Sequence, residues 1–468
     1  MKNRRNRKRG RAVCGARCAL TLTAVFLLGL LPGFLMMEQA AQAEEPAAAA
    51  AAVFEEVEIR DETGGASEPA AKPAPALYGG DGRGSIRSTD ASSRPADALA
   101  DSQTALLFEY FDRYAAALGA LEETSLLDLF DESDPSAKES AWIDQTALTY
   151  LIELRRMSGR DLSFSDYDYG LTFEAVERSG DGLRVVLLED QRTRFASLGE
   201  IDSFTAGIGH VFVLRETGDG WKIAAHQRFE DLQEQIEEGF SRHAGGNPEE
   251  VSKLVLDELL ADAKENIAAR ETAYAEYRAR RGNLLSTDRT WDCDYDRAAA
   301  VAYARAWTDP VRAARNPDFG RYDQYGGNCN NFTSQCLLAG GIPMDHEGDA
   351  QWKWYGEEVN VRESASGRSP SWAGVDEFYE YCLQNEGFGL VSEATDNIYL
   401  AQPGDILQFG SLGEWEHSVI VTGILADENG FTADLLIHSN TADRMDYPAS
   451  AYSYSEMRLI RIFGWNEG

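Results

Sequence analysis

The chain has 468 residues, with 44 Lys and Arg against 78 Asp and Glu, so its formal net charge is −34. Its 43% hydrophobic and 10% aromatic residues suffice for packed cores, which excludes a wholly disordered chain, and the length allows two or three domains of about 100–200 residues each. The strong acidity argues against nucleic-acid binding and against adsorption to anionic lipids or wall polymers, because those partners attract clustered Lys and Arg.

Residues 1–43 are built like an export signal. They hold eight Lys and Arg and one acid, an apolar run from Ala19 to Met37, and the small residues of Ala41-Gln42-Ala43. We predict cleavage after Ala43, and removing those eight basic residues and one acid from the total of −34 leaves a body of −41. A retained membrane anchor is the alternative, because 19 residues can span a bilayer. Either way we expect a secreted or extracytoplasmic protein, attached to a membrane only through an uncleaved signal.

Residues 44–103 are dominated by Ala, Pro, Gly and Ser. Their apolar side chains are too sparse to offset the entropy of ordering, so we predict a disordered low-complexity linker. An alanine-rich helix over residues 44–58 is the local alternative.

Residues 104–245 are predicted to form an α+β domain. Apolar side chains recur at helical spacing over 104–118 and 141–157. Two pairs of alternating segments follow, each joined through a Gly-Asp-Gly turn that is typical of a β-hairpin: 171–177 with 183–189, and 210–216 with 221–227. Helices followed by an antiparallel sheet resemble the cystatin/NTF2-like family in fold pattern alone, which implies no chemistry. We interpret His210 and His226 as ordinary strand histidines.

Residues 246–290 are predicted to be a connecting helix. Pro248 suits its first position and Gly282 its stop, with acids near the start and arginines near the end. The alternative is that this helix completes the first domain.

Cys329 is the strongest candidate for a reactive residue. The segment 329–341 reads as a helix stopped by Gly340 and Gly341, so Cys329 stands at the helix N-terminus. Unpaired N–H groups and the helix dipole there favour the thiolate, and its backbone N–H could serve as an oxyanion donor.

Two histidines further along the chain could supply a base. His417 begins a predicted strand, and His438 ends another. A cysteine on a helix together with strand-borne imidazoles fits the logic of a nucleophile, a base and an orienting group.

The segment around Cys329 resembles a known family. The block Gly326-Gly327-Asn328-Cys329-Asn330-Asn331-Phe332, followed by Ser334-Gln335-Cys336, is similar to the putative amidase domain family, as are Pro403-Gly404-Asp405 and His417-Ser418. The resemblance covers residues 291–468. Where that family more often has an Asp before the cysteine and a Thr after it, this chain has Asn328 and Asn330.

The resemblance implies a papain-like α+β fold of the NlpC/P60 and CHAP kind, and it implies a cysteine amide hydrolase that acts on peptide or peptidoglycan-type bonds. By the same resemblance Cys329 is the nucleophile, His417 the base and His438 the orienting residue. Asn440 and Asp443 compete for that third role. Tyr322 and Tyr325 join the Cys329 N–H as oxyanion candidates. No cofactor and no metal is expected.

Two other functions stay open. A zinc hydrolase would use His417, His438 and a carboxylate, although no His-Glu-x-x-His cluster is present. A non-enzymatic extracellular binding protein is the second alternative. Among the remaining cysteines, Cys336 and Cys382 read as buried small residues, and a Cys293–Cys382 pair is left open.

Overall fold

The computed structural model describes residues 76–77, 83–87, 95–309, 315–323 and 327–468. The predicted signal of residues 1–43 lies outside these ranges, as does most of the predicted linker. The parts of the linker that are described include two short strands and a 3-10 helix: β1 (Ala76–Leu77), β2 (Gly84–Arg87) and η2 (Pro95–Ala98). Strand β2 pairs in parallel with β3, so this portion of the segment joins the folded body.

The first folded part combines helices with long antiparallel strands. Asp134 caps one helix by accepting from the Ser136 N–H, and Pro135 fills the first helical position. The β3–β4 turn closes on Ser179 and Gly182, with Gly180 at a φ of 62° that favours glycine. The elements are α4 (Asp101–Ala120), α5 (Pro135–Met157), β3 (Phe164–Ser179), β4 (Gly182–Phe195), β5 (Ser203–Thr217), β6 (Gly220–Arg228) and α6 (Asp231–Arg242).

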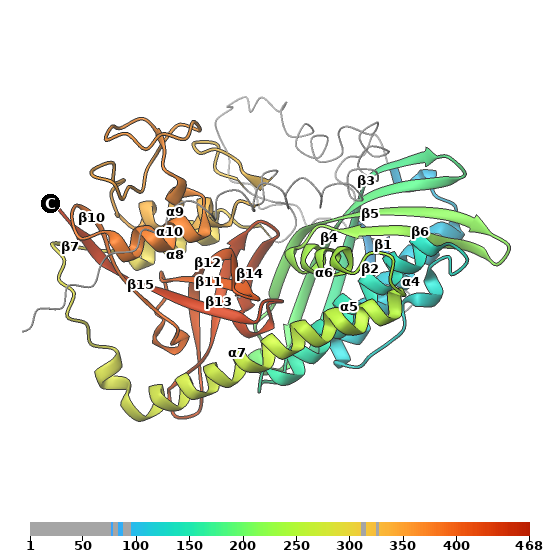
Figure 1. Ribbon diagram of the computed structural model, residues 1–468, viewed down its shortest axis with the longest axis horizontal. Helices are drawn as coiled ribbons and strands as arrows, with labels where there is room; N and C mark the ends of the chain where they lie inside the picture. Colours follow the sequence, from blue (N-terminus) through green and yellow to red (C-terminus); the bar gives the residue numbers. More distant parts are fainter. Residues whose placement is uncertain (1–75, 78–82, 88–94, 310–314, 324–326) are drawn as a thin grey trace, which may run out of the picture. The chain divides into compact units, whose positions relative to one another are not determined.

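The long helix α7 (Pro248–Leu284) connects the first part to the second (Figure 1). Asn247 caps its start by accepting from the Glu249 N–H, and Pro248 takes the predicted first position. The helix is kinked at Arg280, where φ is −134° and ψ is 19°, two residues before the predicted stop at Gly282. A last helical stretch continues beyond Gly282, until the Leu285 N–H bonds to the Arg281 carbonyl.

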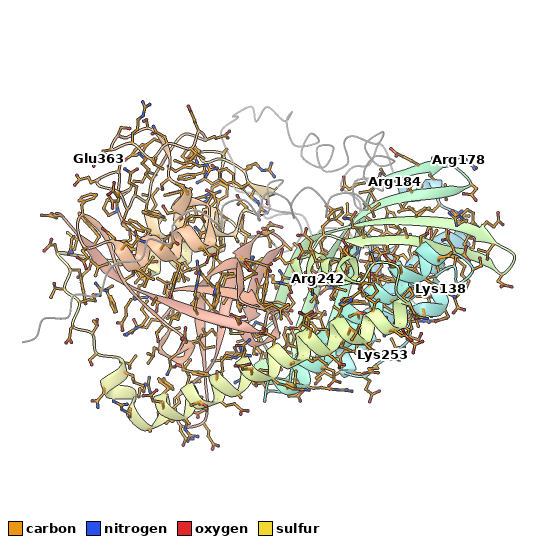
Figure 2. The ribbon with its side chains drawn as sticks, in the orientation of Figure 1. Lys138, Arg178, Arg184, Arg242, Lys253 and Glu363 are labelled. Carbon is orange, nitrogen blue, oxygen red and sulfur yellow. The ribbon has the colours of Figure 1, made fainter. Side chains whose placement is uncertain are left out.

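Exposed ion pairs lie on the surfaces of α6 and α7. Figure 2 shows Arg242 on α6 and Lys253 on α7. Arg242 pairs with Glu258 at 2.8 Å and Lys253 pairs with Glu249 at 2.8 Å. Because about half or more of each partner is exposed, these pairs contribute little stability.

The second part places three helices on one face of an antiparallel sheet (Figure 1). Ile406, Ile420 and Ile460 point to these helices, whereas Leu407, Val419 and Leu459 pack on the opposite face with Tyr277 of α7. The elements are β7 (Cys293–Asp294), α8 (Arg297–Ala306), α9 (Cys329–Ala339), β8 (Trp354–Tyr355), β9 (Gly367–Arg368), α10 (Val375–Gln384), β10 (Gly389–Thr395), β11 (Ile406–Ser411), β12 (Glu414–Ala426), β13 (Thr432–Asn440), β14 (Asp443–Pro448) and β15 (Glu456–Asn466).

The two parts share one continuous sheet, which the sequence did not predict. Strand β5 pairs with β14 through Ala206 with Asp443, Thr205 with Arg444 and Phe204 with Met445. Among the described residues thirteen strands join this sheet, in the order β1-β2-β3-β4-β5-β14-β13-β12-β11-β15-β10, with β6 on β5 and β7 on β15. The protein is therefore a mixed α+β structure with a large sheet and several helices.

Within the described ranges, no helix combines the length and apolar character needed to cross a bilayer.

Candidate active site

The turn that presents Cys329 is held by the amide of Asn328. Its Oδ1 accepts from the Tyr322 backbone N–H at 3.2 Å and from Asn331 Nδ2 at 2.8 Å. Its Nδ2 donates to Asn440 Oδ1 at 2.5 Å, and its backbone N–H donates to Thr441 Oγ1 at 3.2 Å. This network fixes the start of α9 against the end of β13, so the first helical residue is placed by several independent contacts.

Cys329 is the first residue of α9 and only 4% of it is exposed. Its Sγ lies 3.9 Å from the Glu416 carbonyl oxygen. Burial, together with the charge of Asp231, raises the pKa of the thiol to about 11, against the backbone N–H groups of Ser418 and Asn330, which lower it. The group is therefore a protonated thiol at neutral pH in this structure.

His417 lies on β12, opposite Phe409 of β11. Its Nε2 is 3.4 Å from the Tyr452 hydroxyl, which also lies 2.9 Å from Ser439 Oγ. The Tyr454 ring stacks on the imidazole at 5.9 Å between centroids. Burial, together with the charge of Arg444, lowers the pKa of His417 to about 3, so the imidazole is neutral at pH 7.

The structure brings the Cys329 sulfur to the backbone on both sides of His417. The sulfur contacts the carbonyl of Glu416, and the Ser418 N–H acts on it from the other side. Pairing of β12 with β13 starts only at Ile420, so this stretch of β12 is paired through its β11 edge. The hydrogen bonds of the thiol and of the imidazole do not join the two groups in this state.

His438 lies on the face of the sheet that α8, α9 and α10 cover, whereas His417, opposite Phe409, lies on the face away from these helices. His438 is opposite Ile420 in the β12–β13 register, and Ile420 packs beneath the helices. Its Nδ1 is 2.9 Å from Thr308 Oγ1, and its Nε2 is 3.5 Å from Asp446 Oδ1. Burial lowers the pKa of His438, although Asp446 raises it. The structure does not bring this imidazole to His417, whose partner is the Tyr452 hydroxyl.

The remaining predicted site residues have mainly local roles. The Tyr322 hydroxyl accepts from Trp354 Nε1 at 2.9 Å, and Asn440 Nδ2 donates to the Trp307 carbonyl at 3.0 Å. Asp443 accepts from Arg315 at 2.7 Å. Tyr325 lies outside the described residues.

The start of α6, in the first part, contacts two residues beside the candidate site, a feature that the sequence did not predict. The Tyr454 hydroxyl donates to Asp231 Oδ2 at the start of α6, and Gln235 Nε2 donates to Glu416 Oε2 at 2.6 Å. Burial, together with nearby charges that include Asp231, raises the pKa of Glu416 to about 7. The alternation in Tyr452-Ser453-Tyr454 was the only pattern in the sequence that could have placed both tyrosines on one face of the chain near the site. No sequence pattern indicated that Asp231 lies there.

A second buried polar cluster lies in the first part. It contains His210 and His226, which the sequence indicated only as ordinary strand histidines. His226 Nδ1 is 2.6 Å from Asp144 Oδ2, and its Nε2 is 3.0 Å from His210 Nδ1. His210 Nε2 is in turn 3.2 Å from Glu189 Oε2. These four residues form a continuous buried chain from α5 across the sheet.

The four cysteines that the structure describes are free thiols, so Cys293 and Cys382 do not pair here. Cys336 and Cys382 are buried in α9 and α10, as predicted. No group of three or more His, Cys, Asp or Glu residues in the described ranges is arranged to hold a metal ion.

Residues 294–463 match the sequence model of the family described as putative amidase domain. The uncharacterized protein YhbB of Bacillus subtilis (strain 168) is 32% identical over 156 residues, which make up 33% of this chain and 44% of YhbB. This chain therefore covers less than half of that relative. No solved structure matches the chain. The segment that carries Cys329 and His417, residues 294–463, is thus similar to the putative amidase domain family.

Proposed function

We propose that residues 294–463 hydrolyse amide bonds through the Cys329 thiol. The observation that carries the proposal is the position of this thiol at the start of α9, against the backbone on either side of His417, within a domain of an amidase family. The papain-like fold of this part and the cystatin/NTF2-like fold of the first part remain predictions.

In the proposed reaction Cys329 is the nucleophile and His417 carries the proton. Cys329 Sγ attacks the carbonyl carbon while His417 takes the thiol proton, and the imidazolium then gives this proton to the leaving amine. The N–H groups of the first turn of α9 lack helical partners and stabilise the oxyanion. Water, deprotonated by the neutral imidazole, then cleaves the thioester, which regenerates the thiol and releases the acid.

The pKa values argue for proton transfer during attack and not for a preformed ion pair. With the thiol pKa at about 11 and the imidazole pKa at about 3, the neutral pair is the resting state. The His417 imidazole lies with Phe409 and Tyr452 on the face of the sheet away from α9, so it must also turn from Tyr452 toward the sulfur. We infer that Tyr452 has the positioning role that the sequence analysis assigned to His438.

We propose peptide or peptidoglycan-type amides as the substrates and an extracytoplasmic location, in keeping with the export signal predicted over residues 1–43. A zinc mechanism is not favoured, because the described residues contain no suitable ligand cluster.

The test compares the wild type with Cys329→Ala on peptide amides and on purified wall fragments, with release of amines and new carboxyl groups as the readout. We expect cleavage by the wild type, its loss in Cys329→Ala, and little change in the control Cys293→Ala, whose thiol lies in β7. Iodoacetamide is expected to inactivate the wild type slowly, and EDTA is expected to have no effect. Full activity in Cys329→Ala contradicts the proposal.

The burial of Cys329 favours a second candidate, a non-catalytic binding protein. Such a protein would cleave none of these amides in any variant, yet it would retain wall fragments or peptides in a pull-down. Cys329→Ala would leave that retention unchanged.

A further inference from the structure

Arg155 of α5 is a buried cation without a carboxylate partner. Only 5% of it is exposed, and none of the ion pairs among the described residues includes it. Its Nη2 donates to the Tyr447 hydroxyl at 3.1 Å, whereas its Nε and Nη1 have no hydrogen-bond partner. The rings of Phe164 and Phe195 offset part of the cost through cation–π contacts at 5.5 and 5.6 Å. Buried charges are normally paired, so this guanidinium lacks a counterion.

Arg155 lines a cavity of about 50 Å³. The same cavity is lined by Arg228 and Arg444, and the acid among the lining residues is Glu230. Arg228 is 8% exposed, and its Nη1 also lacks a partner, although its Nε donates to Glu230 at 2.5 Å. Arg444 pairs with Glu230 at 2.6 Å, so this carboxylate is shared by two guanidinium groups, and Arg228 Nη2 also lies 3.6 Å from Glu189 Oε2. Arg155 is the guanidinium of the three that has no carboxylate partner among the described residues.

We propose that this cavity binds the carboxylate of a small ligand between Arg155 and Arg228. A carboxylate offers planar oxygens that match guanidinium N–H groups, and its charge supplies the missing counterion. A space of this volume holds a group of a few heavy atoms, since a single water needs about 10–15 Å³ on the same measure. The proposal does not depend on the amide hydrolysis proposed above.

Tyr452 gives the cavity a position beside the candidate active site. This residue lines the cavity, lies under the Arg444 guanidinium at 4.7 Å and contacts His417 through its hydroxyl. A bound carboxylate would therefore lie one residue away from the imidazole.

The test measures the melting temperature of the full chain in acetate, N-acetylglycine, phosphate and chloride at equal ionic strength and pH 7. We expect a rise in the carboxylates that exceeds the rise in chloride and phosphate and that saturates with concentration. Acetate represents a free small acid, and N-acetylglycine represents the carboxyl end of a peptide. A response to either supports the proposal, and the stronger response identifies the source.

Arg155→Met should abolish the carboxylate response. In carboxylate-free buffer its melting temperature is expected to equal or exceed that of the wild type, because an apolar chain of similar size replaces an unpaired charge. The matched control is Arg156→Met, next on the same helix, where the arginine is 42% exposed and pairs with Glu153. The control should keep the full response.

Should Arg155→Met fail to fold, Arg155→Lys keeps the charge and loses the planar fork, and its response should weaken at least about tenfold in concentration. Isothermal titration of the wild type with acetate and with N-acetylglycine needs no variant. The proposal is overturned by equal shifts in chloride and carboxylates, by a preference for phosphate, by an unchanged response in Arg155→Met, or by the absence of binding heat for both carboxylates.

Discussion

At the scale of single residues, burial dominates the chemistry of the candidate site. It raises the pKa of the Cys329 thiol and lowers the pKa of the His417 imidazole, so both groups are neutral at pH 7. The helix dipole and the N–H groups of the first turn favour the thiolate, but they do not overcome desolvation in this state. A reactive pair therefore requires water, substrate or a conformational change to reach the sulfur.

The buried His210 leads to a prediction on stability at low pH. Burial lowers its pKa to about 4, although Glu189 raises it. Because this is below the ordinary value of 6.5, the unfolded chain binds more protons between these two pH values, so stability falls as the pH drops from about 6.5 to about 4. The pKa of Glu189 is lowered by Arg228 and His210 against its burial, and this acts in the same direction. We expect His210 alone to contribute a loss of about 3 kcal/mol at most.

Urea unfolding at pH 7 and pH 4.5 measures this effect in the wild type and in His210→Gln. The variant should be less stable at pH 7, since it disturbs the bonds to His226 and Glu189, and its stability should depend less on pH. His243→Gln, at an exposed position, serves as the control and should follow the wild type. An equally steep pH dependence in His210→Gln contradicts the assignment.

The sequence identified Cys329 as a candidate nucleophile, but it did not identify the side chains that contact the candidate base, His417. Cys329 could be identified because helix signals are local: a glycine-rich approach, a helical pattern and a stop at Gly340. The partner of His417 could not, because Tyr452 reaches it from a segment 35 residues away. His438 was assigned a role from its order in the chain, and the β12–β13 register then placed it on the other face of the sheet.

At the scale of elements, the start of α6 contacts residues beside the candidate site. Its first residue, Asp231, accepts from the Tyr454 hydroxyl, and Gln235 reaches Glu416 next to His417. The charge of Asp231 also opposes formation of the Cys329 thiolate. Restricted access and the unfavourable charge both make the resting thiol unreactive.

Asp231→Asn should therefore make Cys329 more reactive. The substitution removes a charge that raises the thiol pKa and weakens the contact with Tyr454, so we expect alkylation by iodoacetamide at pH 8 to become several-fold faster, up to about tenfold for each unit by which the pKa falls. Mass spectrometry of the peptide that contains Cys329 separates this reaction from labelling of Cys293.

Asp257→Asn is the control for this experiment, since it removes an exposed carboxylate of α7 away from the site. Its alkylation rate should equal that of the wild type. A rate for Asp231→Asn that matches both would show that neither the charge nor the contact of Asp231 restrains the thiol.

The elements themselves were predicted well where the signal is local. The glycine turns at Gly180 and Gly220 fall where the hairpins were expected, although the strands extend well beyond the alternating segments. The contacts of α6 with Tyr454 and Glu416 join residues far apart in the chain, for which a single sequence carries no pattern.

At the scale of the whole molecule, the β5–β14 pairing makes two predicted domains into one structural unit. Three residue pairs join the strands, and Ser203 Oγ adds a hydrogen bond to the Asp446 carbonyl at 2.7 Å. The predicted boundary between these parts rests on a change in composition near residue 291. Strands β5 and β14 are more than 200 residues apart in the chain, and their pairing leaves no signal in the amino-acid composition.

Arg444 holds this junction, so its loss should separate the unfolding of the two parts. It is opposite Thr205 in the β5–β14 register, pairs with Glu230 at 2.6 Å and stacks on Tyr452 and Tyr447. Because most of its side chain is buried, Arg444→Met leaves Glu230 with a weaker set of partners and should cost about 3 kcal/mol. Scanning calorimetry should show one cooperative transition in the wild type and two transitions in the variant, the first at a lower temperature.

Arg305→Met is the matched control for this experiment. Its partner Asp446 also lies in β14, but Arg305 is 46% exposed, so we expect one transition near the wild-type temperature. A single, unshifted transition in Arg444→Met would mean that the strand pairing alone couples the two parts and that the buried ion pair adds nothing to it.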